Sequence, residues 1–285
     1  MADFVVHDDL PDFWATAEAL FTADPVRHTV ALTALTRRLD HPDHDGPREI
    51  LVTAYENGEL RGAAVQMPPY PLLSTAIPVD LVDEFAPVVR RLVPNLSGVN
   101  GDRESAEAFA AAWQRLTSSE VTEAMALRLH RLGTLVVPAV PGVLRLATPD
   151  DAELLGPWYS AFMAEAMNHI TRDEDADPVV EVREQIVRGH AHAVWEVDGV
   201  PVSWAAASPP VRAMSRIGPV YTPAEHRGHG YAAAVTAGIS AWARSAGADE
   251  VLLYTDLANP TSNGVYQRIG FTPVLDATEL TFDTP

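Results

Sequence analysis

Apolar residues between Tyr231 and Ala246 recur at helical spacing. Positions on one face, at i, i+3, i+4, i+7 and i+8, are Tyr231, Ala234, Val235, Gly238, Ile239, Trp242 and Ala243. Gly247 follows directly and is the residue type that most often ends a helix. The next apolar run, Val251 to Thr255, is too short for a helix and predicts a buried strand.

The rest of the second half also alternates between the two patterns. Helices are predicted at 149–166, 178–188 and 260–269, the last ended by Gly270. Strands are predicted at 143–147, 192–197, 200–207, 217–222, 271–275 and 279–282. A polar, acidic loop is expected from Asn168 to Asp177.

A weak internal repeat relates the two halves at a separation of 141 residues. Asn57-Gly58 corresponds to Asp198-Gly199, and Pro68-Pro69 to Pro209-Pro210. Each of the first two pairs separates apolar runs and supplies the positive φ angles of a tight turn, so each copy predicts a β-hairpin. We therefore predict two related domains, 1–141 and 142–285, with the boundary near Pro138 to Gly142.

Composition narrows the classes of partner. The net charge of −19 disfavours nucleic acid and anionic lipid, favours a cationic substrate, and means that an anionic cofactor needs a local cluster of donors. The absence of cysteine removes disulfides and thiolate sites, and favours a reducing, cytoplasmic location. The N-terminus lacks a basic signal-peptide region, and no apolar run reaches the length of a membrane span. Close histidine pairs lack a third ligand at typical spacing, so no metal site is predicted.

The segment Arg227-Gly228-His229-Gly230-Tyr231-Ala232 opens the predicted helix and has the composition of a phosphate-binding loop. A helix N-terminus presents unpaired N–H groups and partial positive charge, and glycines let the backbone approach oxygen closely. The same glycines also fit the dinucleotide pattern G-x-G-x-x-A. Residues 223–227, which separate the glycines from the preceding strand, and the late position of the loop count against a nicotinamide enzyme.

In this register the loop resembles the [Gln/Arg]-x-x-Gly-x-[Gly/Ala] motif of the GNAT superfamily of acyl-CoA-dependent N-acyltransferases. Downstream, Asn259-Pro260-Thr261-Ser262 followed by Tyr266-Gln267-Arg268-Ile269-Gly270-Phe271 is similar to the Asn…Tyr-x-x-x-Gly-Phe block of that family. The resemblance is firm over 142–285 and faint over 1–141. It implies an α/β fold in which a mixed, mostly antiparallel sheet is flanked by helices, here in two tandem copies.

The resemblance also implies roles for individual residues. Backbone groups of Val220, Tyr221 and Thr222 would hold the acyl carbonyl and pantetheine arm of acetyl-CoA, the co-substrate. Backbone N–H groups from Gly228 through His229, Gly230 and Tyr231 to Ala232, with Arg227, would hold its pyrophosphate. Asn259 and Ser262 would contact the cofactor arm, although Asn259 before a proline is equally a helix N-cap. Tyr266 would protonate the leaving thiolate, or it is a packing tyrosine.

The presumed reaction is attack of an amine on a thioester, and it benefits from a general base because an alkyl amine is only about 10⁻³ to 10⁻⁴ neutral at pH 7. Four residues are candidates for this base: Glu196, Asp256, Glu165 and His169. The run Arg172 to Asp177 is either a site of attraction for a cationic amine or a solvated loop.

The first half lacks the cofactor loop. At the repeat separation, Arg227, Gly230 and Ala232 correspond to Ala86, Val89 and Arg91, in a segment that predicts a plain helix. Leu129 stands where the second copy has Tyr266 in a similar context. We expect the first half to keep the fold without binding cofactor; the alternative is an unrelated α/β domain.

Taken together, these patterns favour an N-acetyltransferase that acts on a primary amine of a small molecule or peptide. A non-catalytic CoA-binding sensor or scaffold is the alternative, and a nicotinamide oxidoreductase is a weaker one.

Overall fold

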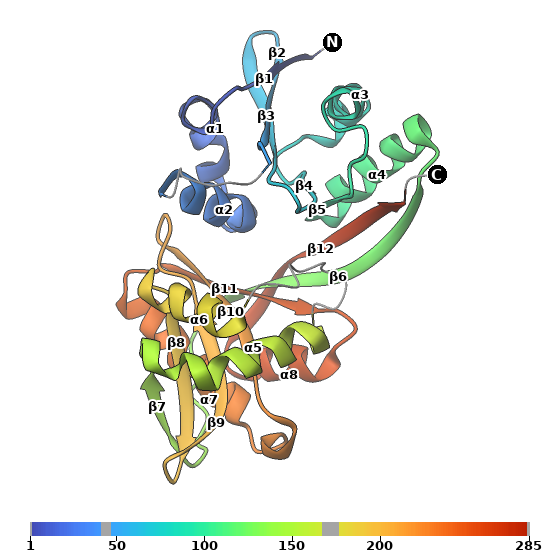
Figure 1. Cartoon of the computed structure of the whole chain (residues 1–285). Helices are drawn as coiled ribbons and strands as arrows, with labels where there is room; N and C mark the ends of the chain where they lie inside the picture. Colours follow the sequence, from blue (N-terminus) through green and yellow to red (C-terminus); the bar gives the residue numbers. More distant parts are fainter. Residues whose placement is uncertain (1, 41–46, 167–176, 284–285) are drawn as a thin grey trace. The chain divides into compact units, whose positions relative to one another are not determined.

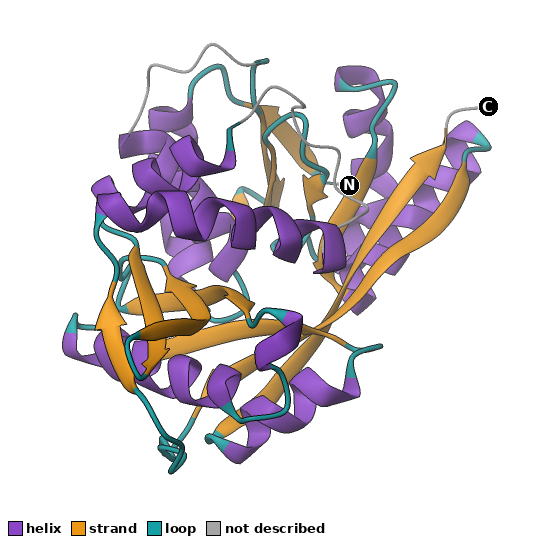
Figure 2. Cartoon of the chain, turned by 60° about the horizontal axis from the view of Figure 1, so that its bottom comes forward, coloured by secondary structure: helices purple, strands orange, loops and turns teal. Residues whose placement is uncertain are grey.

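The computed structural model describes residues 2–40, 47–166 and 177–283. The chain forms two compact units, each a sheet flanked by helices (Figures 1 and 2). Unit 1 comprises residues 1–127 and 275–285, and unit 2 comprises residues 128–274. The sequence predicts a boundary between residues 141 and 142. In the structure, residues 128–141 belong to unit 2, and residues 275–285 belong to unit 1.

Unit 1 has the strand order β1-β2-β3-β4-β5-β12-β6. Neighbours β4 and β5 are parallel, while the pairs β1–β2, β2–β3, β3–β4 and β5–β12 are antiparallel. Its elements are β1 (Asp3–Val6), α1 (Leu10–Ala23), α2 (Thr29–Asp40), β2 (Ile50–Glu56), β3 (Glu59–Gln66), β4 (Leu72–Leu73), a 3-10 turn (Val79–Leu81), α3 (Val82–Leu92), β5 (Gly98–Asp102), α4 (Arg103–Thr117) and β6 (Glu120–Leu132).

Unit 2 continues with the order β12-β6-β11-β10-β9-β8-β7. Neighbours β10 and β11 are parallel, and the pairs β7–β8, β8–β9 and β9–β10 are antiparallel. Its elements are β7 (Val143–Leu146), a 3-10 turn (Pro149–Asp151), α5 (Ala152–Ala166), α6 (Pro178–Val187), β8 (Ala191–Val197), β9 (Val200–Ala207), β10 (Met214–Tyr221), a 3-10 turn (Ala224–His226), α7 (Tyr231–Ser245), β11 (Glu250–Asp256), α8 (Pro260–Arg268) and β12 (Phe271–Asp283).

Both predicted hairpins form, as β2–β3 and β8–β9. Their turn residues have positive φ: 53° and 81° at Asn57 and Gly58, and 51° and 77° at Asp198 and Gly199. The pairing register shifts after Ala54 in the first hairpin and after Trp195 in the second. These two positions are also related by the repeat, so the copies share an irregularity of their sheets as well as a sequence pattern.

Helices cover both faces of the sheet in unit 2. On one face, the predicted apolar side of α7 packs with α8 residues around Val235, Ile239 and Ile269. On the other face, α5 and α6 pack through Leu155 and Val182 against Trp204 of β9. The fold class predicted from the sequence, a mixed and mostly antiparallel sheet with flanking helices, is confirmed.

One element differs from the sequence prediction. The strands expected at 271–275 and 279–282 form a single strand, β12. The polar residues between them predicted a break, but Ala277 and Thr278 pair with Asp102 and Gly101 of β5 and are buried. Further along β12, Phe282 stacks on Trp113 of α4 at a centroid distance of 5.7 Å, which seals the core of unit 1.

Strands β6 and β12 each contribute residues to both units. A fragment of residues 142–285 therefore lacks β6, the neighbour of β11. We expect this fragment to show no cooperative thermal unfolding by circular dichroism, because β11 keeps an unpaired edge. Fragment 119–285, which restores β6, should regain a transition. Equal stability of the two fragments would show that unit 2 does not need β6.

Candidate functional site

The centre of the candidate site is the place where β10 and β11 separate. The two parallel strands pair from Met214 with Glu250 to Ile217 with Leu253. Beyond Ile217, β10 pairs only with β9 on its other side, through Val220 and Tyr221. The carboxyl-terminal ends of β10 and β11 therefore leave backbone groups without a strand partner between them.

A β-bulge accompanies this separation. Ile217 pairs with Ala207 and Val220 with Ala205, so β10 has one residue more than β9 between these pairs. The extra length includes Gly218-Pro219. Proline cannot donate to a strand ladder, so a Gly-Pro pair inside an apolar strand was the available signal for this feature, which sequence reasoning missed.

The glycine-rich loop lies just beyond β10, as predicted. Gly228 and Gly230 both have φ of +82°, a conformation that residues with a Cβ rarely adopt. Gly230 is the N-cap of α7 and provides no capping side chain, and the first turn of α7 contains no acidic residue. Among the described residues, none accepts a hydrogen bond from the backbone N–H groups of Tyr231, Ala232 or Ala233. A helix end with free donors is suited to bind an anion.

Arg227 is engaged with other protein groups. Its Nη2 donates to both carboxylate oxygens of Glu165, at 2.9 and 2.8 Å, and its Nε donates to the carbonyl oxygen of Thr222 at 2.9 Å. Its guanidinium also lies over the ring of Tyr221. The hydrogen bonds that Arg227 donates to Glu165 raise the pKa of Arg227. The backbone of the loop, more than this side chain, is thus available to a phosphate.

The remaining residues of the loop are solvent-accessible. The His229 ring stacks on Tyr231 at a centroid distance of 5.4 Å, and its Nδ1 lies 3.2 Å from the carbonyl oxygen of His226. Thr222 contributes its hydroxyl to a contact of 2.8 Å with Ser203 on β9. These contacts fix the turn between β10 and α7.

Helix α8 starts where β11 ends. Asn259 is its N-cap, and its side chain accepts a hydrogen bond of 3.0 Å from the backbone N–H of Ser262. The capping interpretation of Asn259 is therefore observed directly. The side chain of Ser262 is half-buried and makes no hydrogen bond to a described residue.

Tyr266 lies on α8 and is buried, with 9% of its surface exposed. Its ring meets Phe271 edge-on at a centroid distance of 6.2 Å. Burial raises the pKa of its hydroxyl to about 12. The group therefore stays protonated, and able to donate a hydrogen bond, throughout the neutral pH range.

The four candidate bases lie in different environments. Glu196 is held by Nε of Arg145 at 2.9 Å, and Glu165 is held by Arg227. His169 lies outside the described residues, as do Arg172 to Ala176 of the acidic run, whereas Asp177 caps α6. Asp256, at the carboxyl end of β11, accepts a backbone N–H from Ala258 at 2.8 Å and has no ion-pair partner among the described residues.

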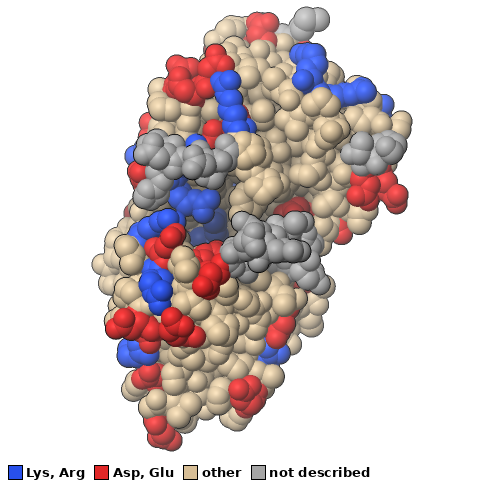
Figure 3. Space-filling view, in the orientation of Figure 1, with Lys and Arg blue, Asp and Glu red and all other residues tan. Residues whose placement is uncertain are grey.

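Acidic and basic side chains intermingle on the face shown in Figure 3, with no separate patch of either sign. No group of three potential metal ligands occurs within residues 2–40, 47–166 and 177–283. No helix in these ranges has the length and apolar character needed to cross a membrane.

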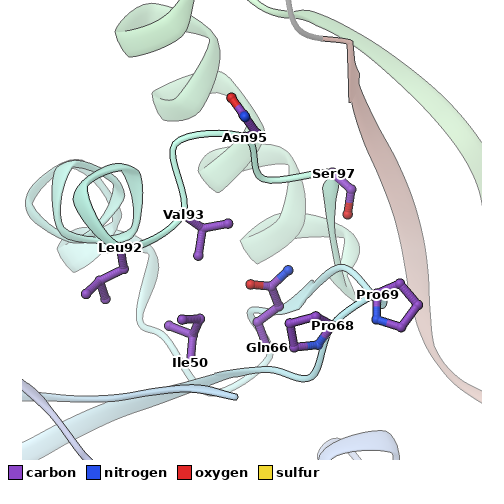
Figure 4. A pocket seen from close by; sticks show the side chains of 8 residues that line it. All are labelled: Ile50, Gln66, Pro68, Pro69, Leu92, Val93, Asn95 and Ser97. Carbon is purple, nitrogen blue, oxygen red and sulfur yellow. The ribbon is translucent and has the colours of Figure 1, made fainter. Parts of the chain in front are cut away.

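Unit 1 contains a cavity of about 390 Å³ that the sequence did not indicate (Figure 4). Its lining is uncharged: Ile50, Gln66, Pro68, Pro69, Leu92, Val93, Asn95 and Ser97. None of these residues belongs to the predicted site, which lies in unit 2.

Unit 1 also contains a parallel strand pair, β4 and β5. These strands pair at two positions, Leu72 with Val99 and Leu73 with Asn100, and the N–H of Ser74 donates to the carbonyl oxygen of Asn100 at 3.0 Å. The hydroxyls of Ser74 and Ser105 are also in contact at 3.0 Å. Helix α3, the counterpart of α7, carries Asp83 and Glu84 in its first turn, which disfavours an anion.

Comparison with known proteins agrees with this geometry. Residues 157–271 match the model of the acetyltransferase (GNAT) family. The matched segment contains the separated strands, the glycine-rich loop and α8. No curated protein matches the chain.

Solved structures share the fold over nearly the whole chain. A GNAT-family acetyltransferase from Colwellia psychrerythraea has a TM-score of 0.64 at 13% identity, covering 99% of this chain and 100% of that one. A GCN5-related N-acetyltransferase from Sphaerobacter thermophilus has a TM-score of 0.62 at 15% identity, covering 99% and 96%. A tandem GNAT protein from the clavulanic acid biosynthesis pathway has a TM-score of 0.57 at 14% identity, covering 99% and 98%.

The two glycines that flank α7 provide a matched test of the loop. Gly230→Ala and Gly247→Ala each place a Cβ at positive φ, 82° and 101°, at a cost of about 1–2 kcal/mol in the free energy of unfolding. Only at Gly230 does the added carbon meet a neighbour, Cγ1 of Val140 at 3.1 Å, beside the free N–H groups.

Both variants should unfold at a lower temperature, but only Gly230→Ala should raise the Kd for CoA, by about tenfold, as measured by calorimetry. Equal affinities of the two variants would remove the loop from the cofactor site.

Proposed function

We propose that this chain, as the bearer of an acetyltransferase (GNAT) family domain at residues 157–271, transfers an acetyl group from acetyl-CoA to a primary amine of a small molecule or a peptide. The observation that carries the proposal is the free N-terminus of α7 next to the place where β10 leaves β11. Separated strands offer backbone hydrogen bonds to an extended amide-containing arm, and the helix end offers donors to a diphosphate.

In this arrangement Val220, Tyr221 and Thr222 line the β10 side of the gap. The N–H groups from Gly228 to Ala232 hold the pyrophosphate. We take the backbone as the main anion ligand because the guanidinium of Arg227 is already bound to Glu165 and Thr222. On the opposite side, Asn259 and Ser262 start α8 close to the end of β11 and contact the cofactor arm.

During turnover the amine nitrogen bonds to the thioester carbon, the C–S bond breaks, and the amine proton passes to a base. At pH 7 a lysine-like amine is almost entirely protonated, and forming its neutral, nucleophilic state costs about 4.6 kcal/mol. A base that removes the proton in the site therefore speeds the reaction. We assign this role to Asp256, directly or through water. It lies at the end of β11 without an ion-pair partner among the described residues, whereas arginines hold Glu165 and Glu196.

Tyr266 donates to the departing sulfur. With a pKa of about 12, its hydroxyl is a weaker acid than a thiol with a pKa near 8.5, so it stabilises the thiolate mainly by hydrogen bonding. The contribution to the rate should therefore be smaller than that of a general acid matched to its leaving group.

A CoA-binding protein without turnover is the second candidate. The ion pair between Glu165 and Arg227 favours it, because it occupies both the arginine of the loop motif and one potential base. Measurement of free thiol release separates the two functions, since a sensor would bind acetyl-CoA without releasing CoA.

For unit 1 we propose a structural role without cofactor binding. The acidic first turn of α3 supports this proposal.

The proposed function predicts selective stabilisation by acetyl-CoA. At a hundred times its Kd, acetyl-CoA should add about 2.7 kcal/mol to the free energy of unfolding, while NAD at the same concentration should add nothing. Differential scanning fluorimetry checks this prediction. Stabilisation by NAD alone would favour an oxidoreductase instead.

Tyr266→Phe should lower kcat by about tenfold to a hundredfold and leave the Kd for acetyl-CoA unchanged, because it removes only the donor to sulfur. Since the pKa of Tyr266 is about 12, the wild-type enzyme should show no loss of activity from its ionisation below about pH 11. Thiol release measured across pH gives both results. A wild-type rate for this variant would exclude Tyr266 as the donor.

An amine library read by mass spectrometry is the way to find the acceptor. The sequence contains 20 arginines and no lysine, so the protein cannot acetylate a lysine side chain of its own. Any acetylated lysine in a peptide pool therefore comes from a substrate, and Asp256→Asn should reduce its formation. Unchanged formation would point to another base.

A further inference from the structure

A chain of hydrogen-bonded side chains within unit 2 links β6 to α8 through β11. His130 is fully buried, and its Nε2 lies 3.0 Å from Oγ1 of Thr255. Thr255 donates its hydroxyl hydrogen to Oδ1 of Asn263 at 2.6 Å. A hydroxyl has a single hydrogen, so Thr255 accepts from His130, and the histidine carries its proton on Nε2.

Asn263 completes the link at the start of α8. Its Nδ2 donates to the carbonyl oxygens of Asp256 and Asn259, at 3.0 and 2.9 Å. It thereby joins the last residue of β11 to the N-cap of the helix. Helix α8 has only nine residues, too few to be stable alone, so its position depends on such tertiary contacts.

The link reaches the proposed proton donor. Tyr266 follows Asn263 by three residues, a spacing that places neighbouring side chains on adjacent turns of a helix. Successive side chains of a strand point to opposite faces, so Thr255 lies on the same face of β11 as Val251 and Leu253. Val251 and Leu253 belong to the same hydrophobic core as Tyr266, Ile269 and Phe271. Asp256, the proposed base, has its carbonyl held by the same asparagine.

We propose that His130, Thr255 and Asn263 are positioning residues for acetyl transfer, which hold Tyr266 at the open ends of β10 and β11. This inference rests on the proposed function. The chain of hydrogen bonds fixes the junction between β11 and α8, so its loss should affect the rate of the chemical step more than the affinity for cofactor.

Thr255→Val replaces the hydroxyl by a methyl group of similar shape. It should lower kcat by about fivefold to tenfold while the Kd for acetyl-CoA changes by less than about twofold. Thr255→Ser, which keeps the hydroxyl, should restore the rate. The matched control is Thr236→Val, because Thr236 is fully buried in the same unit and its hydroxyl has no partner among the described residues. Its kcat should match the wild type.

A double-mutant cycle separates positioning from general destabilisation. In the Tyr266→Phe background, Thr255→Val should lower kcat by less than about twofold, because the hydroxyl that it positions is already absent. If the two effects multiply, or if Thr255→Val alone has wild-type kcat, the inference is overturned. Asn263→Ala, at a half-buried position, repeats the test should Thr255→Val be insoluble.

The outcome for Tyr266→Phe alone keeps the two proposals apart. If this variant has the wild-type rate, Tyr266 is not the proton donor, and His130, Thr255 and Asn263 then have no catalytic group to position. A slow Tyr266→Phe combined with a fully active Thr255→Val removes only the positioning role.

Discussion

The early end of the pairing between β10 and β11 is the constraint on which the site depends. The two strands share four paired positions and then separate at the bulge after Ile217. Strand ends that stay paired have no hydrogen-bonding capacity left for a ligand, whereas separated ends keep theirs in fixed orientations. The loop from Arg227 to Gly230 starts from the freed end of β10, and α8 starts after the freed end of β11, so both sides of the site follow from one local break.

Unit 1 places other groups after its parallel strand pair. Beyond the pairing of Leu73 with Asn100, the N–H of Ser74 donates to the carbonyl oxygen of Asn100, and the hydroxyl of Ser105 contacts that of Ser74. Asp102, which caps α4, is also bound by Arg27 at 2.9 Å. These polar side chains are already bound to one another, and the first turn of α3 is acidic. This part of unit 1 therefore offers an anion fewer free donors than the glycine-rich start of α7 does.

Features set by neighbouring residues were accessible from the sequence. The turns at Asn57-Gly58 and Asp198-Gly199, the apolar face of α7 and the glycines at its start all depend on local conformation, and the structure contains each of them. Features set by distant partners were not accessible. Nothing near Arg227 in the sequence indicates Glu165 as its partner, and nothing near Ala277 indicates β5. The hydrogen bond from His130 to Thr255 joins residues 125 positions apart, so no local pattern contains it.

The course of β12 also bears on how the chain folds during synthesis. In unit 1 this strand lies between β5 and β6, although it follows all of unit 2 along the chain. Proteins emerge from the ribosome N-terminus first, at about 5–20 residues per second, and domains usually fold as they appear. Here β5 keeps an open edge, and the ring of Phe282 is missing from the core, until unit 2 and then β12 have been synthesised. The first unit to be made is therefore exposed to chaperones and to premature aggregation for as long as the second takes to be synthesised.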